Sequence, residues 1–467
     1  MDYPSYVVPP SAPSAARTQD PVAVALGNAS LLGVGYLMLR RWTLAVANLV
    51  VTAALVTAVV MVEKPWCEIA VVAWWLVVIA HGWYLGSRGQ RATDRGRRLV
   101  ALIVTVEVLL AVGILRFDAG RIADSVAEAR ESGNCTDVRT AQDKVQFGHR
   151  VANAPLAVRG DEDVKSCDRL DTARTHLRTG LRGDTGELTA GFDTLGSVLA
   201  EPGQDKTVDV VLTEFLEGLP TADPCQTVGI TDWLRQRKPT KNALDRSADT
   251  VKKVAPTALV ACGDRLTAGK TWLSARMRYQ QLLTQYPGNS LTGRAQIGIR
   301  KATLALELAE VRERLQGFGD TQPQYCDKPA KYSGAVPYRK GATNLAMFFG
   351  NKEYSNRLPA QWRTGDVTRA ALIVCADPPE NGSAVQTCSY SSDTFPFPSD
   401  VTFYRIAIPL KVYEVRTGRL VSNARVQISG TSCPQTFYAS NLAPPSSEFV
   451  TASNANIQAA FRYLIVR

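Results

Sequence analysis

The sequence predicts three folded parts: an α-helical membrane unit, an α-helical exterior domain of packed hairpins, and a small C-terminal β-rich domain of the α+β class. Long apolar runs gather before residue 118, apolar side chains then recur at helical spacing to about residue 320, and strand-like runs follow. A chain of 467 residues can bury several cores. We therefore expect a tail, a membrane unit, a helical domain and a β-rich domain over residues 1–21, 22–117, 118–320 and 321–467.

The N-terminal tail, residues 1–21, is rich in proline and carries few charges. This composition is typical of a disordered segment, because it offers too few apolar side chains to form a core. The tail also lacks a basic stretch followed by a cleavage site, so we do not expect a secretory signal peptide.

Four apolar segments follow, each about 18–21 residues long, the length of a helix that crosses roughly 30 Å of hydrocarbon. They cover residues 22–39, 42–62, 66–86 and 99–117. Four such runs in tandem favour membrane helices over the buried core helices of a soluble protein. The first run contains Gly27, Asn28, Ser30, Gly33 and Gly35. It either spans the membrane or enters and returns on one side, and we expect it to span.

Arginine predicts the orientation of these segments. The loop over residues 87–98 carries five arginines against one aspartate, and a second basic turn, Arg40–Arg41, lies on the same side if the segments alternate. Basic loops remain in the cytoplasm. The fourth segment therefore runs outward, and residues 118–467 are predicted to lie on the extracytoplasmic side of the cell membrane. The two turns carry +6 of the chain's net charge of +10, so we expect no nucleic-acid partner.

Cysteine usage indicates the same compartment. Cys67 lies in the membrane unit, and the other eight cysteines follow residue 118: Cys135, Cys167, Cys225, Cys262, Cys326, Cys375, Cys388 and Cys433. An even number confined to the predicted exterior is typical of disulfides formed in an oxidising compartment. Connectivity does not follow from the sequence, but local order suggests Cys135–Cys167, Cys225–Cys262, Cys375–Cys388 and Cys326–Cys433. The chain has no Cys-x-x-Cys motif and little histidine, so we expect no metal site.

One stretch of the helical domain, residues 262–290, allows two interpretations. Gly269-Lys270-Thr271 matches the end of a phosphate-binding loop, which also needs a glycine five residues earlier. That position holds Asp264, whose charge would repel phosphate, and Gly263 lies one residue too far away. The sequence therefore favours a helical hairpin and no nucleotide cofactor.

This stretch resembles one repeat of the tetratricopeptide family, closest to the repeats of envelope assembly proteins. That family places small and large apolar residues at fixed positions on two packed helices, with a proline after the second. The matching residues are Gly263, Trp272, Ala275, Tyr279, Leu282, Leu283 and Pro287. The resemblance covers residues 255–305 and implies that Gly263 and Ala275 let the helices approach while the larger side chains fill the groove. An ordinary helical hairpin is the alternative.

The whole chain also resembles a family of multi-pass membrane proteins from streptomycete-type actinobacteria. The stretches that carry the resemblance are VALGNASLLGVGYLMLRRW, FGHRVANAPL, NALDRSAD and IPLKVYEVRTGRLV. It implies a cell-envelope protein with a helical exterior domain, and it implies no activity.

The β-rich domain contains one strong hairpin signal and one helix signal. VYEVRTGRLVSNARVQI predicts two strands joined by a turn at Thr417-Gly418. Residues 452–465 predict a closing helix whose N-cap is Ser453 or Asn454.

The sequence shows no catalytic constellation. His149 and His176 lie near no distinctive serine or cysteine motif, and we expect both to be surface or packed helix residues. The carboxylates Asp161, Glu162 and Asp163 are interpreted as a solvated loop. We therefore expect no enzyme activity.

Two ionisable residues lie inside the apolar segments. His81 and Glu107 fall about 8 and 12 Å in from the shared basic loop, counted at 1.5 Å per residue. Ionisable groups in a membrane are usually paired. We expect a structural hydrogen bond between them, with a proton-linked or sensing role as the alternative.

These observations predict a non-enzymatic, membrane-anchored extracytoplasmic scaffold or adaptor. Its partners would be the lipid bilayer and a protein or cell-envelope component bound by the helical domain. The alternative is a sensor or transport accessory that couples an exterior ligand to the membrane helices. The sequence does not define the ligand or the oligomeric state.

Overall fold

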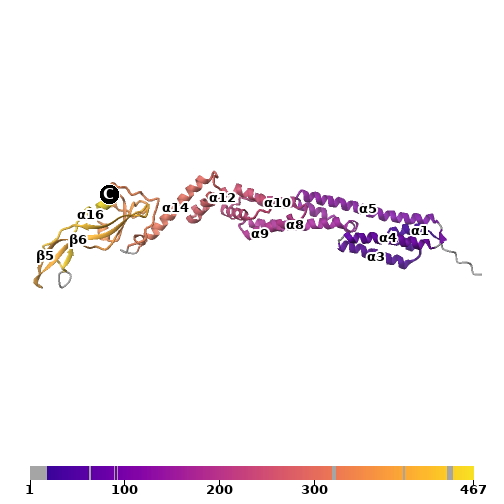
Figure 1. The fold of residues 1–467 in the computed structure, drawn as a ribbon, viewed down its shortest axis with the longest axis horizontal. Coiled ribbons are helices and arrows are strands. Elements are labelled where there is room, and N and C mark those ends of the chain that lie inside the picture. The colour runs from indigo at the N-terminus through magenta and orange to yellow at the C-terminus, as the bar shows by residue number, and fades with distance from the viewer. Residues whose placement is uncertain are drawn as a thin grey trace, which may run out of the picture. The chain divides into compact units, whose positions relative to one another are not determined.

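The computed structural model describes residues 18–62, 65–88, 90–91, 93–317, 322–392, 395–438 and 445–466 (Figure 1). The chain divides into two compact units, Met1–Val254 and Ala255–Arg467. This division does not coincide with the boundaries expected after residues 117 and 320. Most of the predicted disordered tail lies outside the described residues.

The first unit begins with an apolar bundle of helices. Its elements are α1 (Pro21–Ala29), α2 (Val34–Met38), α3 (Trp42–Val62), α4 (Pro65–Ser87) and the first part of α5 (Arg95–Glu131), with a two-residue parallel pairing of β1 (Thr18–Gln19) and β2 (Gln90–Arg91). Within the described residues, α3, α4 and α5 are long and apolar enough to cross a membrane. Two of the predicted segments, 42–62 and 66–86, are thus helices of about the expected length, and the segment 99–117 is part of the longer helix α5.

The first apolar segment is different, and the expectation that it spans as one helix is wrong. It forms two short helices, α1 and α2, with a break between them. Leu31 and Gly33 in the break adopt positive φ angles of 61° and 73°, which a continuous right-handed helix does not allow. The chain therefore turns back on itself after nine helical residues.

Side chains from all three long helices satisfy the carbonyl oxygens that this break exposes. Asn48 of α3, Trp75 of α4 and Thr105 of α5 donate to the carbonyls of Leu31, Ala29 and Leu26, at 2.7, 2.9 and 2.6 Å. A backbone carbonyl left unpaired in an apolar environment costs several kcal/mol, on the order of a lost hydrogen bond. The helix break is therefore stabilised by specific hydrogen bonds from the rest of the bundle.

The start of α1 is fixed by Asp20. Its carboxylate accepts hydrogen bonds from the backbone N–H groups of Val22 and Ala23 and so caps the helix. The same carboxylate accepts from Nε and Nη2 of Arg98, at 2.6 and 3.1 Å. Asp20 therefore ties the hairpin of α1 and α2 to the first turn of α5.

The rest of the first unit is helical, as predicted. The helices are α6 (Cys135–Gln142), α7 (Phe147–Ala152), α8 (Ala154–Gly180), α9 (Thr185–Leu199), α10 (Asp205–Glu217), α11 (Pro224–Gln236) and the 3-10 turn η1 (Ala243–Arg246). Asn134 and Asp184 accept hydrogen bonds from backbone N–H groups at the starts of α6 and α9. These caps explain why the chain changes direction at short polar turns.

Three helices open the second unit: the end of α12 (Ser247–Ala268), α13 (Trp272–Gln285) and α14 (Thr292–Arg314). Residues 262–268 are helical, so no strand leads into Gly269-Lys270-Thr271 and no phosphate-binding loop forms. Of the predicted packing residues, Ala275, Tyr279 and Leu282 are buried. Gly263 contacts the Tyr279 ring, Trp272 and Leu283 are half-buried, and Pro287 is exposed.

A mixed sheet fills the rest of the second unit. Within the described residues its order is β3-β4-β6-β5, with β7 and β8 on β6. The strands are β3 (Ala346–Phe349), β4 (Leu372–Ala376), β5 (Glu380–Ser392), β6 (Phe395–Glu414), β7 (Leu420–Ile428) and β8 (Ser447–Phe449). The short elements are η2 (Gln324–Cys326), α15 (Lys352–Ser355) and η3 (Ala360–Trp362). The predicted hairpin is β6–β7, and Gly418 at its turn has φ 69°.

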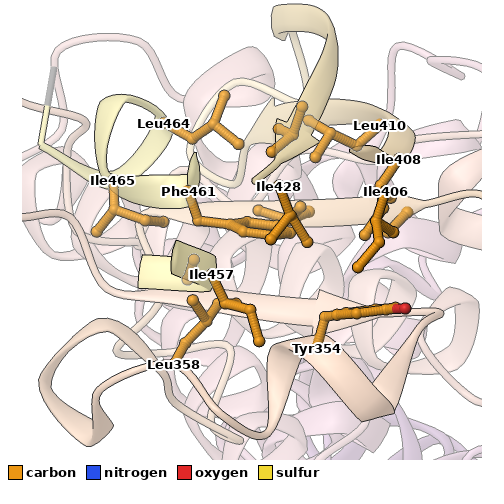
Figure 2. Close-up of a cluster of buried hydrophobic side chains, with 14 of the residues drawn as sticks. Tyr354, Leu358, Ile406, Ile408, Leu410, Ile428, Ile457, Phe461, Leu464 and Ile465 are labelled. Atoms are coloured by element: carbon orange, nitrogen blue, oxygen red, sulfur yellow. The ribbon is translucent and has the colours of Figure 1, made fainter. Parts of the chain in front are cut away.

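The core of this domain lies between the sheet and the closing helix α16 (Asn454–Ile465). Ile457, Phe461 and Leu464 of α16 face Ile406 and Ile408 of β6 (Figure 2). Of the two predicted N-caps, Ser453 is the one that caps the helix.

The disulfides confirm one predicted pairing and correct two. Cys135–Cys167 is present, and Cys225 and Cys262 are each disulfide-bonded. The other pairs are Cys326–Cys375 and Cys388–Cys433, so the predicted Cys375–Cys388 and Cys326–Cys433 are wrong.

The course of β6 explains the correction. Cys375 pairs across the sheet with Lys411 of β6, whereas Cys388 pairs with Val401. Ten residues of strand separate these two positions, roughly 33 Å at 3.3 Å per residue. Two cysteines that far apart cannot form a disulfide.

Candidate functional site: a polar pocket in the helical domain

A pocket of about 650 Å³ lies in the helical part of the first unit. It is built by the end of α5, by α8 and by the turn before α10. Its lining is almost entirely polar or charged: Arg130, Arg159, Glu162, Asp163, Lys165, Ser166, Arg169, Glu201, Pro202 and Gln204. Four side chains are cationic and three are anionic, so the pocket contains one more basic than acidic group.

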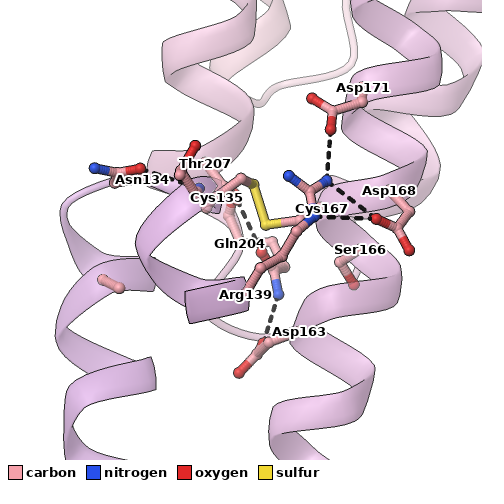
Figure 3. Close-up of a disulfide and its surroundings, with 12 residues drawn as sticks. Asn134, Cys135, Arg139, Asp163, Ser166, Cys167, Asp168, Asp171, Gln204 and Thr207 are labelled. Carbon is pink, nitrogen blue, oxygen red and sulfur yellow. Dashed lines mark hydrogen bonds and ion pairs between the residues drawn. A yellow bond between two sulfur atoms is a disulfide. The ribbon is translucent and has the colours of Figure 1, made fainter. Parts of the chain in front are cut away.

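The Cys135–Cys167 disulfide fixes the wall beside this pocket (Figure 3). Cys135 is the first residue of α6, and its bond to Cys167 holds that helix against the middle of α8. The neighbouring residue on α8, Ser166, lines the pocket. Arg139 of α6 reinforces the junction through ion pairs with Asp168 and Asp171, at 3.0 and 2.5 Å.

Asp163 contacts two other side chains of the pocket. Its Oδ1 accepts from Nε2 of Gln204 at 2.8 Å and lies 3.6 Å from Nη1 of Arg130. Gln204 is held in turn by the hydroxyl of Thr207, which donates to its amide oxygen at 2.8 Å. Burial nevertheless raises the pKa of Asp163, because these partners do not fully replace its hydration.

A second acid, Glu201, is paired. It accepts from the hydroxyl of Ser166 at 2.6 Å and forms an ion pair with Arg169. Burial acts to raise the pKa of Glu201, but the hydrogen bonds from Arg169 and Ser166 outweigh it, and the net pKa is lowered. Glu201 is therefore a stable anion that neutralises Arg169.

The other cations are less fully engaged. Nε of Arg130 is buried and has no hydrogen-bond partner. The guanidinium of Arg130 packs against Gly203, where a β-carbon would lie 2.9 Å from Cζ. Arg159 and Lys165 are exposed at the pocket and make no ion pair within the described residues. Arg159 and Lys165 therefore offer free donors toward a ligand.

This chemistry suits recognition more than catalysis. Arginine and lysine bind carboxylate and phosphate groups through charge-assisted hydrogen bonds. No histidine or cysteine thiol lines the pocket, and the described residues contain no group of side chains suited to a metal ion. The arrangement can hold an anionic group.

His149 and His176, the two histidines of the helical domain, lie elsewhere and have structural partners. Nε2 of His149 lies 3.1 Å from Asp118, and its Nδ1 accepts from the backbone N–H of Gln146. His176 lies 2.6 Å from Glu187. Both are packed against neighbouring elements of the helical domain, as expected.

The structure does not bring together the predicted intramembrane pair. Nδ1 of His81 lies 2.8 Å from the hydroxyl of Tyr36 on α2, a partner that the sequence did not suggest. The Glu107 side chain is exposed on α5 and makes no hydrogen bond or ion pair within the described residues. The helix break places Tyr36 beside His81, which explains the difference.

Sequence reasoning missed the pocket. The interpretation of Asp161, Glu162 and Asp163 as a solvated loop is wrong, because all three lie within α8. Asp161 pairs with Arg150 at 2.6 Å, while Glu162 and Asp163 line the pocket. The clustering of opposite charges over residues 159–169 was the available signal.

Comparison with models of protein families, with curated proteins and with solved structures gave no match.

Proposed function

We propose that this chain is a membrane-anchored extracytoplasmic adaptor without enzyme activity, which binds a protein or cell-envelope component through the polar pocket of its helical domain. In this arrangement α3, α4 and α5 cross the membrane, and the residues after the apolar part of α5 lie outside. We also propose, as part of this function, that the chain is related to tetratricopeptide repeats over residues 255–305 and to actinobacterial membrane proteins over its length.

Several observations support this placement. Three helices have the length and apolarity of membrane spans, and all eight cysteines after residue 118 are disulfide-bonded, which suggests an oxidising compartment. Cys67, within the apolar bundle, is a free thiol. The bond between Asp20 and Arg98 places the start of α1 at the basic end of α5. The hairpin of α1 and α2 would then enter and leave on the cytoplasmic side.

The observation that carries the binding role is the unbalanced cation content of the pocket. Arg159 and Lys165 have no ion-pair partner within the described residues, and Arg130 keeps an unpaired Nε. Its ligand would therefore present a carboxylate or phosphate group. Surface anions of a cell envelope or of a partner protein have this chemistry.

Charge reversal in the pocket tests the proposal. The full chain in nanodiscs would be sedimented with purified cell-wall sacculi of its own organism. We expect the Arg159→Glu/Lys165→Glu variant to lose about tenfold or more in binding, because each charge-assisted hydrogen bond contributes about 1.5–3 kcal/mol. The matched control is Lys144→Glu/Lys206→Glu, which makes the same charge change on exposed residues outside the pocket. An equal loss of binding in both variants would show that the net charge of the chain, and not the pocket, determines binding.

A second candidate, a sensor or transport accessory, is favoured by the continuity of α5. This one helix, Arg95–Glu131, carries Arg98 at one end and Arg130 at the other. About 48 Å separates the two residues, at 1.5 Å per residue. A ligand in the pocket that displaces Arg130 would thus act on the same rigid element that holds Asp20.

This candidate predicts coupling between the two ends. A cysteine pair replacing Asp20 and Arg98 would cross-link in nanodiscs, where both faces of the bilayer are accessible, and added sacculi would change the cross-linking rate. The adaptor alone predicts binding with no change in cross-linking.

A further inference from the structure

A second pocket, of about 430 Å³, lies at the opposite end of the apolar bundle from the basic turns. It lies between α3, α4 and α5, where α7 crosses them, and its lining includes Val56, Val72, Val112 and Phe147. This volume is within the range of roughly 300–1,000 Å³ that is common for ligand sites. The walls are apolar except for two side chains, Glu68 and Arg116.

The roof of this pocket is held in place by specific contacts. Nη1 of Arg116 donates to the carbonyl of Ala152 at 3.0 Å, and His149 contacts Asp118 at 3.1 Å. A β-carbon on Gly148 would lie 3.2 Å from the side chain of Leu115, so α7 and α5 pack closely. Val59, which lines the pocket, also packs in a buried cluster with Cys67 and Ala154.

The two charged side chains make the pocket selective. Glu68 and Arg116 each lack an ion-pair partner within the described residues, although both line one pocket. A ligand that satisfies them must present an anion and a hydrogen-bonding cation beside an apolar chain. The surrounding side chains are exposed and apolar, for example Val72 at 54% and Val112 at 46%. In the proposed placement these side chains face lipid.

We propose that this pocket binds one bilayer phospholipid with a primary-amine headgroup, its acyl chain lying along α3 and α5. The phosphate would pair with Arg116 and the ammonium group with Glu68. The inference depends on the proposed membrane placement but not on the binding role of the polar pocket. It gives α7 the role of a lid on a lipid site at the outer boundary of the membrane.

Native mass spectrometry of the full chain tests this assignment. The protein would be released from nanodiscs that contain equal amounts of phosphatidylethanolamine, phosphatidylcholine and phosphatidylglycerol. We expect the protein to retain one phosphatidylethanolamine about tenfold more than phosphatidylcholine. The methylated amine of phosphatidylcholine cannot donate a hydrogen bond to Glu68, and about tenfold is the effect of losing one hydrogen bond between charged groups. Phosphatidylglycerol lacks the cation and should also be retained weakly.

Variants separate the two headgroup contacts from the chain contact. Glu68→Gln should abolish the preference for phosphatidylethanolamine over phosphatidylcholine, and Arg116→Gln should weaken retention of all three lipids. Val112→Trp should fill the pocket and remove the bound lipid, at a position exposed enough to accept the larger ring. Arg121→Gln, exposed on α5 outside the pocket, is the matched charge control and should behave as wild type.

Two results would overturn the inference. Equal retention of the three lipids by wild type and by Glu68→Gln would mean non-selective annular lipid. Recovery of the wild-type chain in the soluble fraction would overturn both this inference and the membrane placement. If the chain is found in membranes but retains the three lipids equally, this inference alone is overturned.

Discussion

A β-carbon on Gly298 of α14 would lie 2.5 Å from the ring of Tyr279 on α13, and one on Gly263 of α12 would lie equally close to the other edge of that ring. Tyr279 is 1% exposed, and its hydroxyl donates to Asp264 at 2.7 Å. The Tyr279 ring therefore fills the space between α12 and α14, and only glycine at positions 263 and 298 lets these helices lie so close to the ring. The spacing of α12, α13 and α14 depends on this contact.

Gly298→Ala should therefore destabilise the second unit, although alanine is the better helix former. The added methyl group overlaps the Tyr279 ring, and overpacking of this kind costs about 1–3 kcal/mol. Chemical denaturation of the full chain, followed by far-ultraviolet circular dichroism, would measure the loss.

Gly293→Ala on the same helix is the control. A β-carbon there meets nothing within 4 Å, so the change should stabilise by up to about 1 kcal/mol through helix propensity. If both substitutions stabilised the protein, Tyr279 would not be confined as the structure shows.

The ion pair of Asp20 and Arg98 predicts a pH dependence of the hairpin. The hydrogen bond from Arg98 lowers the pKa of Asp20 below its usual 3.8. Because the folded-state pKa is the lower one, the contribution to stability is present above pH 3.8 and is lost as the pH falls through the folded-state value. Limited proteolysis of the N-terminal segment between pH 2 and 7 should show cleavage rising only at the acid end.

Asp20→Asn should remove this acid dependence and destabilise the hairpin at neutral pH. Asparagine keeps the N-cap but loses the charge. We expect a partial loss of stability, because the Arg98 side chain is 37% exposed and water screens its pairing with Asp20. Unchanged proteolysis of Asp20→Asn at pH 7 would show that Arg98 does not hold the hairpin.

Local signals in the sequence were sufficient for much of this fold. The bounds of α3, the Ser453 cap and the β6–β7 turn follow from composition and from neighbouring residues. The break between α1 and α2 does not, because residues 22–39 have the length and apolarity of a spanning helix. The break is stabilised by side chains that lie far along the chain, such as Trp75 and Thr105.

The same reason explains the errors in the disulfides and at the candidate site. Pairing by local order succeeds for Cys135–Cys167, which joins helices close in sequence, and fails in the sheet, where β6 separates Cys375 from Cys388. The polar pocket joins the end of α5 and the middle of α8 to the turn at Gln204. No periodicity within one segment predicts such a meeting.

Asp163 predicts an opposite pH dependence in the helical domain. Burial raises its pKa above 3.8, so the folded state holds the proton more tightly than the unfolded state. Its contribution to stability is therefore full below pH 3.8 and is lost as the pH rises through the folded-state pKa. Asp163→Asn keeps the acceptor for Gln204 but does not ionise. Relative to wild type, its stability should rise between pH 4 and neutrality.

The disulfides allow the cellular location of the chain and its fold to be tested together. In intact cells, a membrane-impermeant thiol reagent should label the chain only after reduction, because Cys67 is buried and the other eight cysteines are bonded. Peptide mapping without reduction should recover Cys135–Cys167, Cys326–Cys375 and Cys388–Cys433.

Replacing both Cys135 and Cys167 by alanine should lower the free energy of unfolding by about 3–4 kcal/mol, since their bond closes a loop over a sequence separation of 32. Free thiols shielded until lysis would instead place the helical domain in the cytoplasm, and the pocket's ligand would then have to be sought there.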